Sequence, residues 1–410
     1  MVGVDMDLDL PTFKPGDEVG GHKLVQWLAN GQFSTVWHAR PAPPGTTKRR
    51  GRRRKLDCSV LEADVAIKFY TSDPLYADLA GIEARNLACA NPDHHPHLQY
   101  ALGSLDAAQP GLILPIAACD LHTHMDGAKG LSAKAAALCV AQVASALHHL
   151  HARGMAHGDV KPENVLVYPS PAEIYVRLTD LDSLQYTTPD ALRQYGRRRA
   201  APTTADDAAT DPPDDRIRAR TNPDLGVREY CVAFGDGQEA YVEEPAVTLE
   251  FRAPEFIIFG EYGCPADVWA LGCIFFELRT GEGLFDLEGE NRDGPMQSGD
   301  EDANDDDAAD ADADDDERAD RRHLQQMIAV LGPAPEDLGI GDIDGGAPAS
   351  ISARLRQRRV RDRRRVETVL EEMMTWHPAD RCTADRVRSY CVETYDLAKE
   401  SAVPSEPAPA

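Results

Sequence analysis

The stretch HGDVKPENVLV, from His157 to Val167, constrains the fold of this chain more than any other segment. It places a carboxylate (Asp159), an amine (Lys161) and a carboxamide (Asn164) within six residues, and then becomes apolar. A short apolar run bounded by polar residues is typical of a buried strand. We therefore expect a polar loop, with Gly158 at its start, whose far end is anchored in a hydrophobic core.

These three polar side chains suit chemistry at a phosphoryl group. Asp159 can accept or orient a hydroxyl proton. The carboxamide oxygen of Asn164 is a hard ligand suited to Mg²⁺, and Lys161 can neutralise charge that develops on a phosphoryl group. A solvated polar turn is the alternative for this stretch taken alone, so the rest of the chain has to decide between the two interpretations.

Predicted strands come first in the chain and predicted helices follow. KLVQWLANG and FSTVWHAR are typical of two strands around a turn, and ADVAIKFY is typical of a third. Residues 132–154 have the periodicity of one helix, with Ser132 as its N-cap and Gly154 at its end. Residues 265–281 are apolar nearly all round, which indicates a buried helix. We expect an α+β fold with a small strand-rich part and a larger helical part.

Three segments interrupt this globular pattern. Residues 48–55 are KRRGRRRK, residues 200–215 are rich in Ala, Pro, Asp and Thr, and 12 of the 18 residues in 300–317 are Asp or Glu. Such segments bury too little apolar area to offset the entropy of ordering the chain, so we expect mobile loops. The basic run is open to two interpretations, a nuclear import signal or a solvated loop.

The expected organisation is two lobes joined near Pro115–Cys119. We expect a disordered terminus at 1–15 and a small lobe at 16–117, which carries a basic insertion at 41–57. We expect the large lobe at 118–396, with a mobile insertion at about 190–245 and an acidic disordered insertion at about 287–320. A disordered tail is expected at 397–410. The arginine-rich run from Arg354 is expected to be a basic helix of the large lobe. It lacks the interleaved aromatic residues that would stack on bases.

Composition argues against several classes of protein. Nine cysteines occur without a CxxC pair, which excludes the usual zinc spacing and disfavours a disulfide framework, so we expect reduced thiols. The first residues have neither a basic start nor a long apolar run, and we expect no secretory signal. No apolar run is long enough to span a bilayer. We therefore expect a soluble protein of the cytoplasm, the nucleus or both, although its net charge of −26 is extreme.

Several motifs occur in an order that one family requires. VAIK ends at Lys68 on the third predicted strand, and Glu83 lies on the amphipathic helix that follows. TDLD places Asp180 after the HGDVKPEN loop, TLEFRAPE ends at Glu255, and Arg381 in HPADRCTADR is expected to pair with Glu255. Together with DVWALGC in the buried helix, these motifs resemble those of eukaryotic protein kinases. The resemblance covers most of the chain apart from the insertions, and it implies the bilobal protein kinase fold.

The resemblance implies ATP and Mg²⁺ as cofactors and a protein substrate, without direct binding of nucleic acid or membrane. Asp159 would orient the acceptor hydroxyl and take its proton, and Lys161 would steady the transferring phosphoryl group. The HGDVKPEN stretch, residues 157–164, corresponds to the catalytic loop of the family. Thr248 matches a threonine that contacts this loop in the family, which favours Ser or Thr as acceptor. Asn164 and Asp180 would bind the metal. The nucleotide would be held by Lys68, braced by Glu83, and by Leu28, Gly31, Val36, Ala66 and Leu166.

Three features depart from the family pattern. Ala29 and Ser34 replace the outer glycines of the glycine-rich loop around Gly31. Gly158 replaces an arginine that in many kinases binds a phosphorylated residue, so we expect activity without that phosphorylation unless another basic residue takes over. Asp182 replaces a glycine, and a side chain there resists positive backbone angles. A pseudokinase, which uses the fold without turnover, is therefore the alternative.

The subgroup can also be predicted. Arg252 directly before APE, and HLQQMIAVLGPAPEDL after the acidic block, resemble the CMGC group. GQFSTVW and the missing arginine of the H-x-D motif are similar to SR-protein kinases, which implies Arg/Ser-rich substrates. The acidic block is then either a solvated spacer or an electrostatic attractant for such substrates. A scaffold that binds basic partners without turnover is a further alternative.

Overall fold

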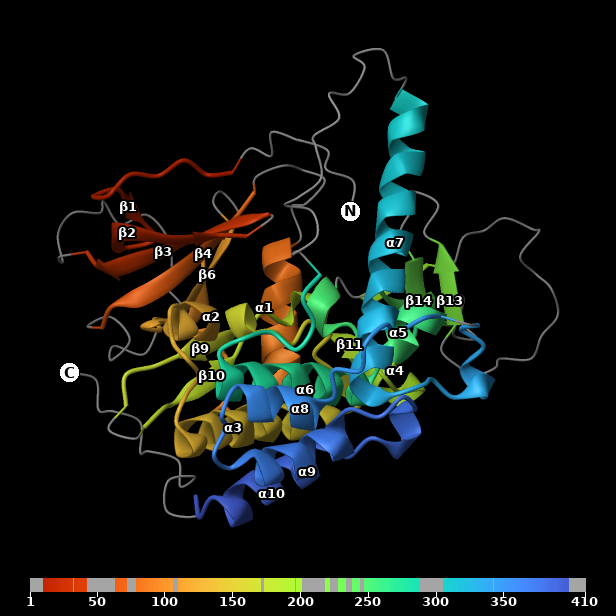
Figure 1. Ribbon diagram of the computed structural model, residues 1–410. Helices are drawn as coiled ribbons and strands as arrows, with labels where there is room; N and C mark the ends of the chain where they lie inside the picture. The colour runs from red at the N-terminus through yellow and green to blue at the C-terminus, as the bar shows by residue number, and fades with distance from the viewer. Residues whose placement is uncertain are drawn as a thin grey trace, which may run out of the picture.

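The computed structural model describes two lobes, a small one built on a curved sheet and a larger one built on helices (Figure 1). This confirms the predicted bilobal α+β fold. The described residues are 10–31, 33–42, 63–71, 79–105, 110–170, 173–195, 197–200, 218–221, 228–233, 238–243, 247–287, 305–341 and 343–397. The basic run 48–55 and the tail from 398 lie outside them.

The small lobe is a six-stranded antiparallel sheet with one helix beside it. The strand order is β1-β2-β3-β4-β6-β5. The elements are β1 (Glu18–Val19), β2 (His22–Asn30), β3 (Ser34–Pro41), β4 (Val65–Tyr70), α1 (Leu79–Ala90), β5 (Gly103–Ser104) and β6 (Gly111–Pro115). The three strands predicted from the sequence are β2, β3 and β4.

Strand β4 explains why the sheet is buried on both faces. Side chains alternate along a strand, and the two sets in VAIKFY enter different cores. Ile67 and Phe69 join the outer cluster with Trp37, whereas Ala66 and Tyr70 join the large core that continues into the helical lobe. Lys68 lies between these last two, so its side chain faces the interlobe side.

The segment before the sheet is partly ordered, which corrects the prediction of a disordered terminus at 1–15. The ring of Phe13 lies 4.4 Å from Phe69 and 6.2 Å from Trp37, measured between ring centroids. An aromatic side chain can cover the outer face of a small sheet, and this contact was not readable from periodicity. Residues 1–9 lie outside the described part.

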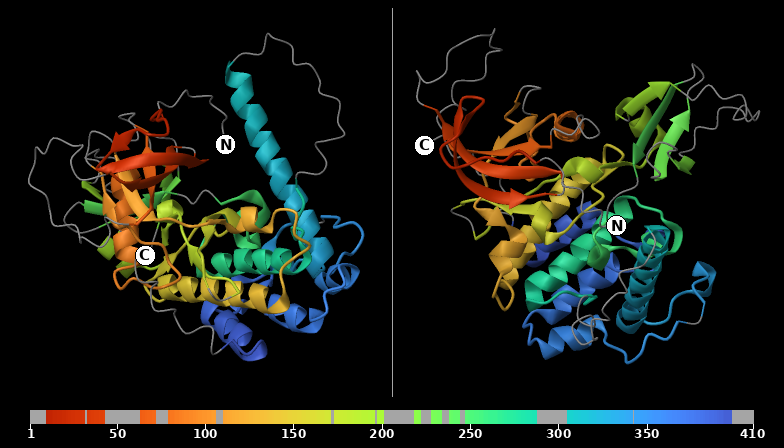
Figure 2. Two further views of the ribbon diagram at one scale, coloured as in Figure 1. Left: turned by 90° about the vertical axis from the view of Figure 1, so that its left-hand side faces the viewer. Right: turned by 90° about the horizontal axis from the view of Figure 1, so that it is seen from above.

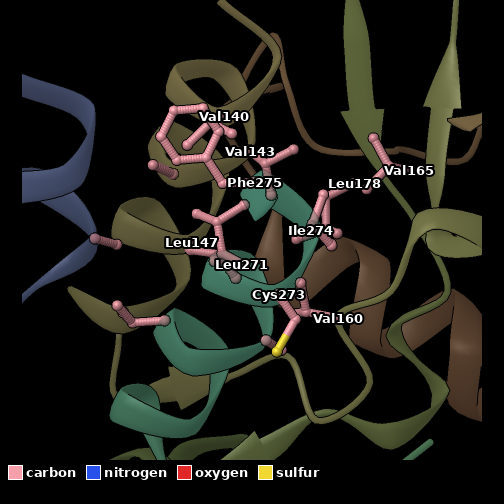
Figure 3. Packing of buried hydrophobic residues seen from close by; sticks show 14 of the residues in the cluster. Val140, Val143, Leu147, Val160, Val165, Leu178, Leu271, Cys273, Ile274 and Phe275 are labelled. Carbon is pink, nitrogen blue, oxygen red and sulfur yellow. The ribbon is translucent and has the colours of Figure 1, made fainter. Parts of the chain in front are cut away.

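The large lobe is organised around two helices, α3 (Ala133–His151) and α6 (Cys264–Thr280). Ser132 caps α3 by accepting a hydrogen bond from the backbone N–H of Ala135, as predicted. Val143 and Leu147 of α3 pack with Leu271 and Ile274 of α6 in the core (Figure 3). Because α6 is buried on nearly every side, it forms a rigid support for the loops above it.

The remaining short elements connect these helices to the site and to the base of the lobe. They are β7 (Cys119–Asp120), α2 (Leu121–Met125), β8 (Met155–Ala156), η3 (Pro162–Asn164), β9 (Val165–Val167), β10 (Val176–Leu178), η4 (Leu181–Ser183), β11 (Gln185–Tyr186), α4 (Pro189–Tyr195), η5 (Leu249–Phe251), α5 (Pro254–Phe259), η7 (Glu336–Leu338), η8 (Pro378–Asp380) and α10 (Ala384–Thr394). The chain passes between the lobes from β6 to β7, and the exact lobe limits stay a prediction.

The insertion expected to be mobile at about 190–245 contains a sheet. Its strands are β12 (Arg197–Ala200), β13 (Arg218–Thr221), β14 (Arg228–Ala233) and β15 (Gln238–Glu243), in the order β12-β15-β14-β13. These strands show regular structure within the insertion, and its mobility stays a prediction. REYCVA and QEAYVE contain the β-branched and aromatic residues that favour strands, and pairing satisfies their backbone groups. Residues 201–217 of the insertion are outside the described part.

The acidic block also differs from its prediction. Helix α7 covers Asp305–Leu331, so the expected disorder is wrong for residues 305–320, while 288–304 are not described. The first half of α7 projects away from the helical lobe in Figure 1 and in the left view of Figure 2. Leu324 and Met327 anchor its second half in the core. Once nucleated there, a helix extends readily through alanine, and acidic residues suit its N-terminal end.

Two smaller predictions change as well. The single basic helix expected from Arg354 is two helices, α8 (Ile351–Gln357) and α9 (Arg363–Met373), because the backbone at Arg359 turns to a positive φ of 57°. The tail was expected to begin at 397, yet Leu397 is fully buried in the core. An apolar side chain at the end of a polar segment can thus extend the folded region by a residue.

The seven cysteines with described side chains are free thiols, as expected. None of the helices in the described ranges combines the length and the apolarity needed to cross a membrane.

A buried ion pair joins the APE segment to the end of the lobe, as the sequence predicted. The guanidinium of Arg381 donates to both carboxylate oxygens of Glu255, at 2.7 and 3.0 Å. It also donates to the carbonyl oxygens of Pro265 and Thr375 and lies over the ring of Trp269. Both charged side chains are almost completely buried, so neither is hydrated if its partner is lost.

We expect Arg381→Met to lower the free energy of unfolding by about 3–5 kcal/mol, because it leaves the Glu255 carboxylate buried and unpaired. Urea denaturation measures this loss. Arg386→Met is the matched control, since Arg386 also contacts both carboxylate oxygens of Glu372, but at the surface, so its removal should cost much less. Equal small losses for the two variants would contradict the assignment.

Candidate active site

Lys68 occupies the centre of a cluster that joins the two lobes. Strand β4 carries Lys68, α1 carries Glu83, and the segment after β10 carries Asp180 and Asp182. The Lys68 Nζ lies 2.7 Å from Glu83 Oε2, 3.0 Å from Asp180 Oδ1 and 3.3 Å from Asp182 Oδ2. The predicted pair of Lys68 with Glu83 is therefore present, and the contact with Asp182 was not predicted.

The charges in this cluster act on one another, and burial raises the pKa of Glu83 to about 8 and also raises the pKa of Asp182. Burial alone would lower the pKa of the Lys68 ammonium, but the charges of Asp180, Glu83 and Asp182 raise this pKa well above its usual value. In return, Lys68 lowers the pKa of the Asp180 carboxyl, against the opposite effect of burial. Lys68 is therefore a cation and Asp180 an anion at neutral pH.

The segment that carries Asp180 is held in an unusual backbone conformation. Asp180 has a φ of 64° and a ψ of 70°, in the left-handed region, and η4 begins directly after it. The side chain of Asn86 on α1 donates to the carbonyl oxygen of Leu181 at 2.8 Å, which ties this segment to the small lobe. Asp182 has no positive φ. The expectation of backbone strain at Asp182 is therefore wrong, and the strained residue is Asp180.

The catalytic loop forms a second polar cluster around Asp159. Lys161 Nζ lies 2.6 Å from Asp159 Oδ2, and Thr248 Oγ1 donates to Asp159 Oδ1 at 2.9 Å. Lys161 also donates to Thr248 Oγ1 at 2.9 Å. Asn164 donates to both the carbonyl and the carboxylate of Asp159, at 2.8 and 3.0 Å. The predicted contact of Thr248 with this loop is thus confirmed, and the structure brings Asp159, Lys161 and Asn164 together.

Asp267 on α6 anchors the start of this loop. It is completely buried and accepts hydrogen bonds from the backbone N–H groups of His157 and Gly158, at 2.8 and 3.3 Å. The side chains of His151 and Tyr262 complete its shell, at 2.8 and 2.7 Å. Burial alone would raise the pKa of Asp267, but the hydrogen bonds from the two histidines lower it. A buried carboxylate of this kind fixes the loop through its backbone.

Gly158 is explained by a close approach of two segments. Its φ is +94°, a conformation that favours glycine. A Cβ at this position would lie 2.9 Å from the carbonyl carbon of Ser183 and closer still to its oxygen. Any side chain would therefore push the catalytic loop away from the segment that carries Asp180 and Asp182.

The residues predicted to enclose the adenine lie on the facing strands. Val36 is directly opposite Lys68 in the β3–β4 pair, and Ala66 is two residues before Lys68, so all three share one face of the sheet. Leu166 pairs with Asp120 in the β7–β9 ladder on the other lobe. Leu28, near the end of β2, completes this set and is 40% exposed. Gly31, predicted for the loop over the phosphates, follows β2, and its N–H donates to the Ser34 carbonyl at 2.8 Å.

The donor set of the site fits a nucleotide and a hard divalent cation. The side-chain N–H groups of Asn164 are used by Asp159, whereas its side-chain oxygen accepts no hydrogen bond from another described residue. Carboxylate and carboxamide oxygens, from Asp180 and Asn164, are ligands that Mg²⁺ favours. A buried ammonium at Lys68 suits phosphate oxygens.

Three residues of the site were missed by sequence reasoning. Asn86 acts through a hydrogen bond to Leu181, a partner far away in the chain that no local pattern reveals. Tyr262 donates to Asp267, which is near it in the chain, but the contact depends on how the loop before α6 folds back. Asp182 was singled out only for its backbone. Its position two residues after Asp180 was a signal that its carboxylate could reach the same lysine.

The chain is similar to a known protein family over most of its length. The family described as "Protein kinase domain" matches residues 89–196 and 224–391, which is more than half of the chain. This chain belongs to the protein kinase family. The first strands of the small lobe, with Lys68 and Glu83, lie outside the match, so there the family assignment rests on the motifs and the structure.

Individual relatives are similar over shorter regions. The chain is 33% identical over 159 residues to the serine/threonine-protein kinase SBK2 of Mus musculus, covering 37% of this chain and 41% of that protein. It is 31% identical over 203 residues to the protein kinase PINOID of Oryza sativa subsp. japonica, covering 47% and 40%. A cyclin-dependent kinase 2 homologue of Crithidia fasciculata is 28% identical over 175 residues, covering 37% and 35%. The chain thus spans about two fifths of the length of these curated relatives.

We expect Gly158→Ala to lower the free energy of unfolding by about 2–5 kcal/mol, since it adds positive-φ strain and an overlap with Ser183. Thermal unfolding measures the loss. Gly127→Ala is the control, because Gly127 has a φ of +68° with no atom within 4 Å of the added Cβ, and should cost only about 1 kcal/mol. A loss at Gly158 no larger than at Gly127 would show that the close approach has no energetic role.

Proposed function

We propose that this protein is a serine/threonine kinase that transfers the γ-phosphoryl group of ATP to protein substrates. The observation that carries this proposal is the presence of two linked polar clusters in one site. Lys68, Glu83 and Asp180 form a cluster of opposite charges that suits a nucleotide. Asp159 and Lys161 form a second ion pair that suits the hydroxyl group accepting the phosphoryl group. The charge of Lys161 contributes to the lowered pKa of Asp180, so the clusters lie within electrostatic reach of each other.

Asp159 is the proposed base and orienting group for the acceptor hydroxyl. Its two oxygens are held by Lys161, Asn164 and Thr248, so the carboxylate cannot rotate freely. A fixed carboxylate can accept the hydroxyl hydrogen bond in one geometry, which lowers the entropic cost of alignment. Lys161 lies next to it and can stabilise negative charge on the transferring group.

Lys68 is the proposed anchor for the α- and β-phosphates, with Glu83 fixing the position of its ammonium. Asp180 and Asn164 would hold Mg²⁺, Leu28, Val36, Ala66 and Leu166 would enclose the adenine, and Gly31 would belong to the loop over the phosphates. A bound magnesium ion neutralises charge on the phosphate oxygens. The preference for Ser and Thr is supported by Thr248, whose hydroxyl contacts both Asp159 and Lys161.

Basic, Arg/Ser-rich proteins are the proposed substrates, by resemblance to SR-protein kinases, in the cytoplasm or nucleus. The acidic sequence of α7 supports this proposal, because 9 of the 13 residues in 305–317 are acidic and none is basic. A segment of this composition attracts cationic chains over a distance of roughly 8 Å at physiological salt. The names of the relatives are divided among several kinds of kinase and favour no subgroup.

We expect Asp159→Asn to reduce phosphoryl transfer by about 10²–10⁴-fold while nucleotide binding persists, since the base is lost and the Lys68 cluster is untouched. Radiolabel transfer from ATP to an Arg/Ser-repeat peptide measures the rate, and the shift of the unfolding temperature with Mg²⁺–ATP measures binding. Equal incorporation in the two proteins would dismiss the enzyme. Binding without transfer in the unsubstituted protein would support the pseudokinase.

We expect an Arg/Ser-repeat peptide to be phosphorylated faster than proline-directed or acidic peptides, with an advantage that shrinks as salt is raised. Screening of the acidic surface of α7 is the reason. The ratio of kcat/KM values at low and high ionic strength measures the effect. A preference for the acidic peptide, or a ratio independent of salt, would contradict the proposed substrate class.

A further inference from the structure

The Lys68 ammonium has its full complement of partners within the chain. An ammonium carries three N–H donors and no acceptor. Three carboxylates lie around it, from Glu83 at 2.7 Å, Asp180 at 3.0 Å and Asp182 at 3.3 Å. A phosphate oxygen can therefore bind Lys68 only by sharing a donor or displacing one of these carboxylates.

Asp182 is the partner most easily displaced. It makes the longest of the three contacts, and its side chain is 47% exposed, against 38% for Asp180 and 3% for Glu83. The backbone around it is nevertheless held, because Leu181 is fully buried and accepts the hydrogen bond from Asn86. The carboxylate thus projects towards Lys68 from a fixed backbone and can move aside through side-chain rotation.

We propose that Asp182 is a positioning residue that competes with the nucleotide phosphates for Lys68 and so weakens binding of ATP. This inference rests on the proposed function and deepens it. Three carboxyl groups surround one ammonium where a triphosphate would bind, so the acidic groups there outnumber the single cation. Charges of the same sign at such distances repel one another. A divalent cation offsets this repulsion, so the affinity for ATP should depend steeply on Mg²⁺.

A metal-binding role for Asp182 would have the opposite consequence. Oxygens of Glu83, Asp180 and Asp182 lie within 4.8 Å of one another, a spacing that could hold a cation. The ammonium of Lys68 is within hydrogen-bonding distance of all three oxygens, so the chain's own cation already fills that position. Competition predicts tighter binding of ATP when the Asp182 charge is removed, whereas metal ligation predicts weaker binding.

The test compares full-length Asp182→Asn with the unsubstituted protein. The asparagine keeps the shape of the side chain and removes its charge. Calorimetry of ATP binding at limiting and saturating Mg²⁺ should give a Kd lower by roughly three- to tenfold in the variant, with the largest gain at limiting Mg²⁺. In transfer assays KM for ATP should fall while kcat stays within about twofold, a split that a purely structural effect would not produce.

Two further variants make the result interpretable. Asp93→Asn removes a carboxylate from a surface pair with Arg153, away from Lys68, and should leave the Kd for ATP unchanged. Asp182→Gly removes the side chain altogether and should also tighten binding, which separates loss of the carboxylate from any new contact made by the amide. Unfolding temperatures establish that each variant is folded.

The outcomes distinguish failure of the inference about Asp182 from failure of the proposed kinase function. Tighter binding in both Asp182 variants supports the inference, most clearly if only they bind ATP measurably. Binding that is equal in all proteins, or weaker in the Asp182 variants, overturns the inference and leaves the proposed kinase function intact. A complete lack of ATP binding in the unsubstituted protein and both variants, at saturating Mg²⁺, overturns both.

Discussion

One buried carboxylate, that of Asp267, fixes the position of the loop that carries Asp159. Asp267 lies in the middle of the core on α6, where a charge without partners would be very unfavourable. It is stabilised by hydrogen bonds from α3, from the backbone of the catalytic loop and from Tyr262. Because these donors come from separate segments, the same bonds that satisfy the charge also position the loop. The geometry of Asp159 and its neighbours depends on this anchor.

The second constraint is the contact between the lobes. The Lys68 cluster takes one group from β4, one from α1 and two from the segment after β10, so it forms only when the lobes meet in one orientation. Gly158 and Ser183 bring the catalytic loop against that same segment. The proposed nucleotide site and the proposed acceptor site are therefore connected through a short stretch of backbone that contains the left-handed residue Asp180.

Much of the site could be predicted because its residues are spaced by local rules. The loop residues Asp159, Lys161 and Asn164 lie within six residues of sequence. Lys68 lies in a run of β-branched and aromatic residues that is typical of a strand. The insertions were predicted less well. The expected acidic disordered insertion at about 287–320 contains part of helix α7, which is anchored in the core by its second half, and the expected mobile insertion at about 190–245 contains strands β12–β15, which pair with one another. Such effects depend on what lies next to a segment in space.

The sequence by itself determined the family, the order of the lobes and the identity of most groups that could bind a nucleotide, because these follow from residue type and periodicity. Only the tertiary structure decided why residue 158 is glycine, which residue carries the backbone strain, and that Asp182 reaches Lys68. Each of these depends on a distance between segments that are far apart in the chain. The periodicity of one segment contains no information about that distance, which is set by packing against the shared core.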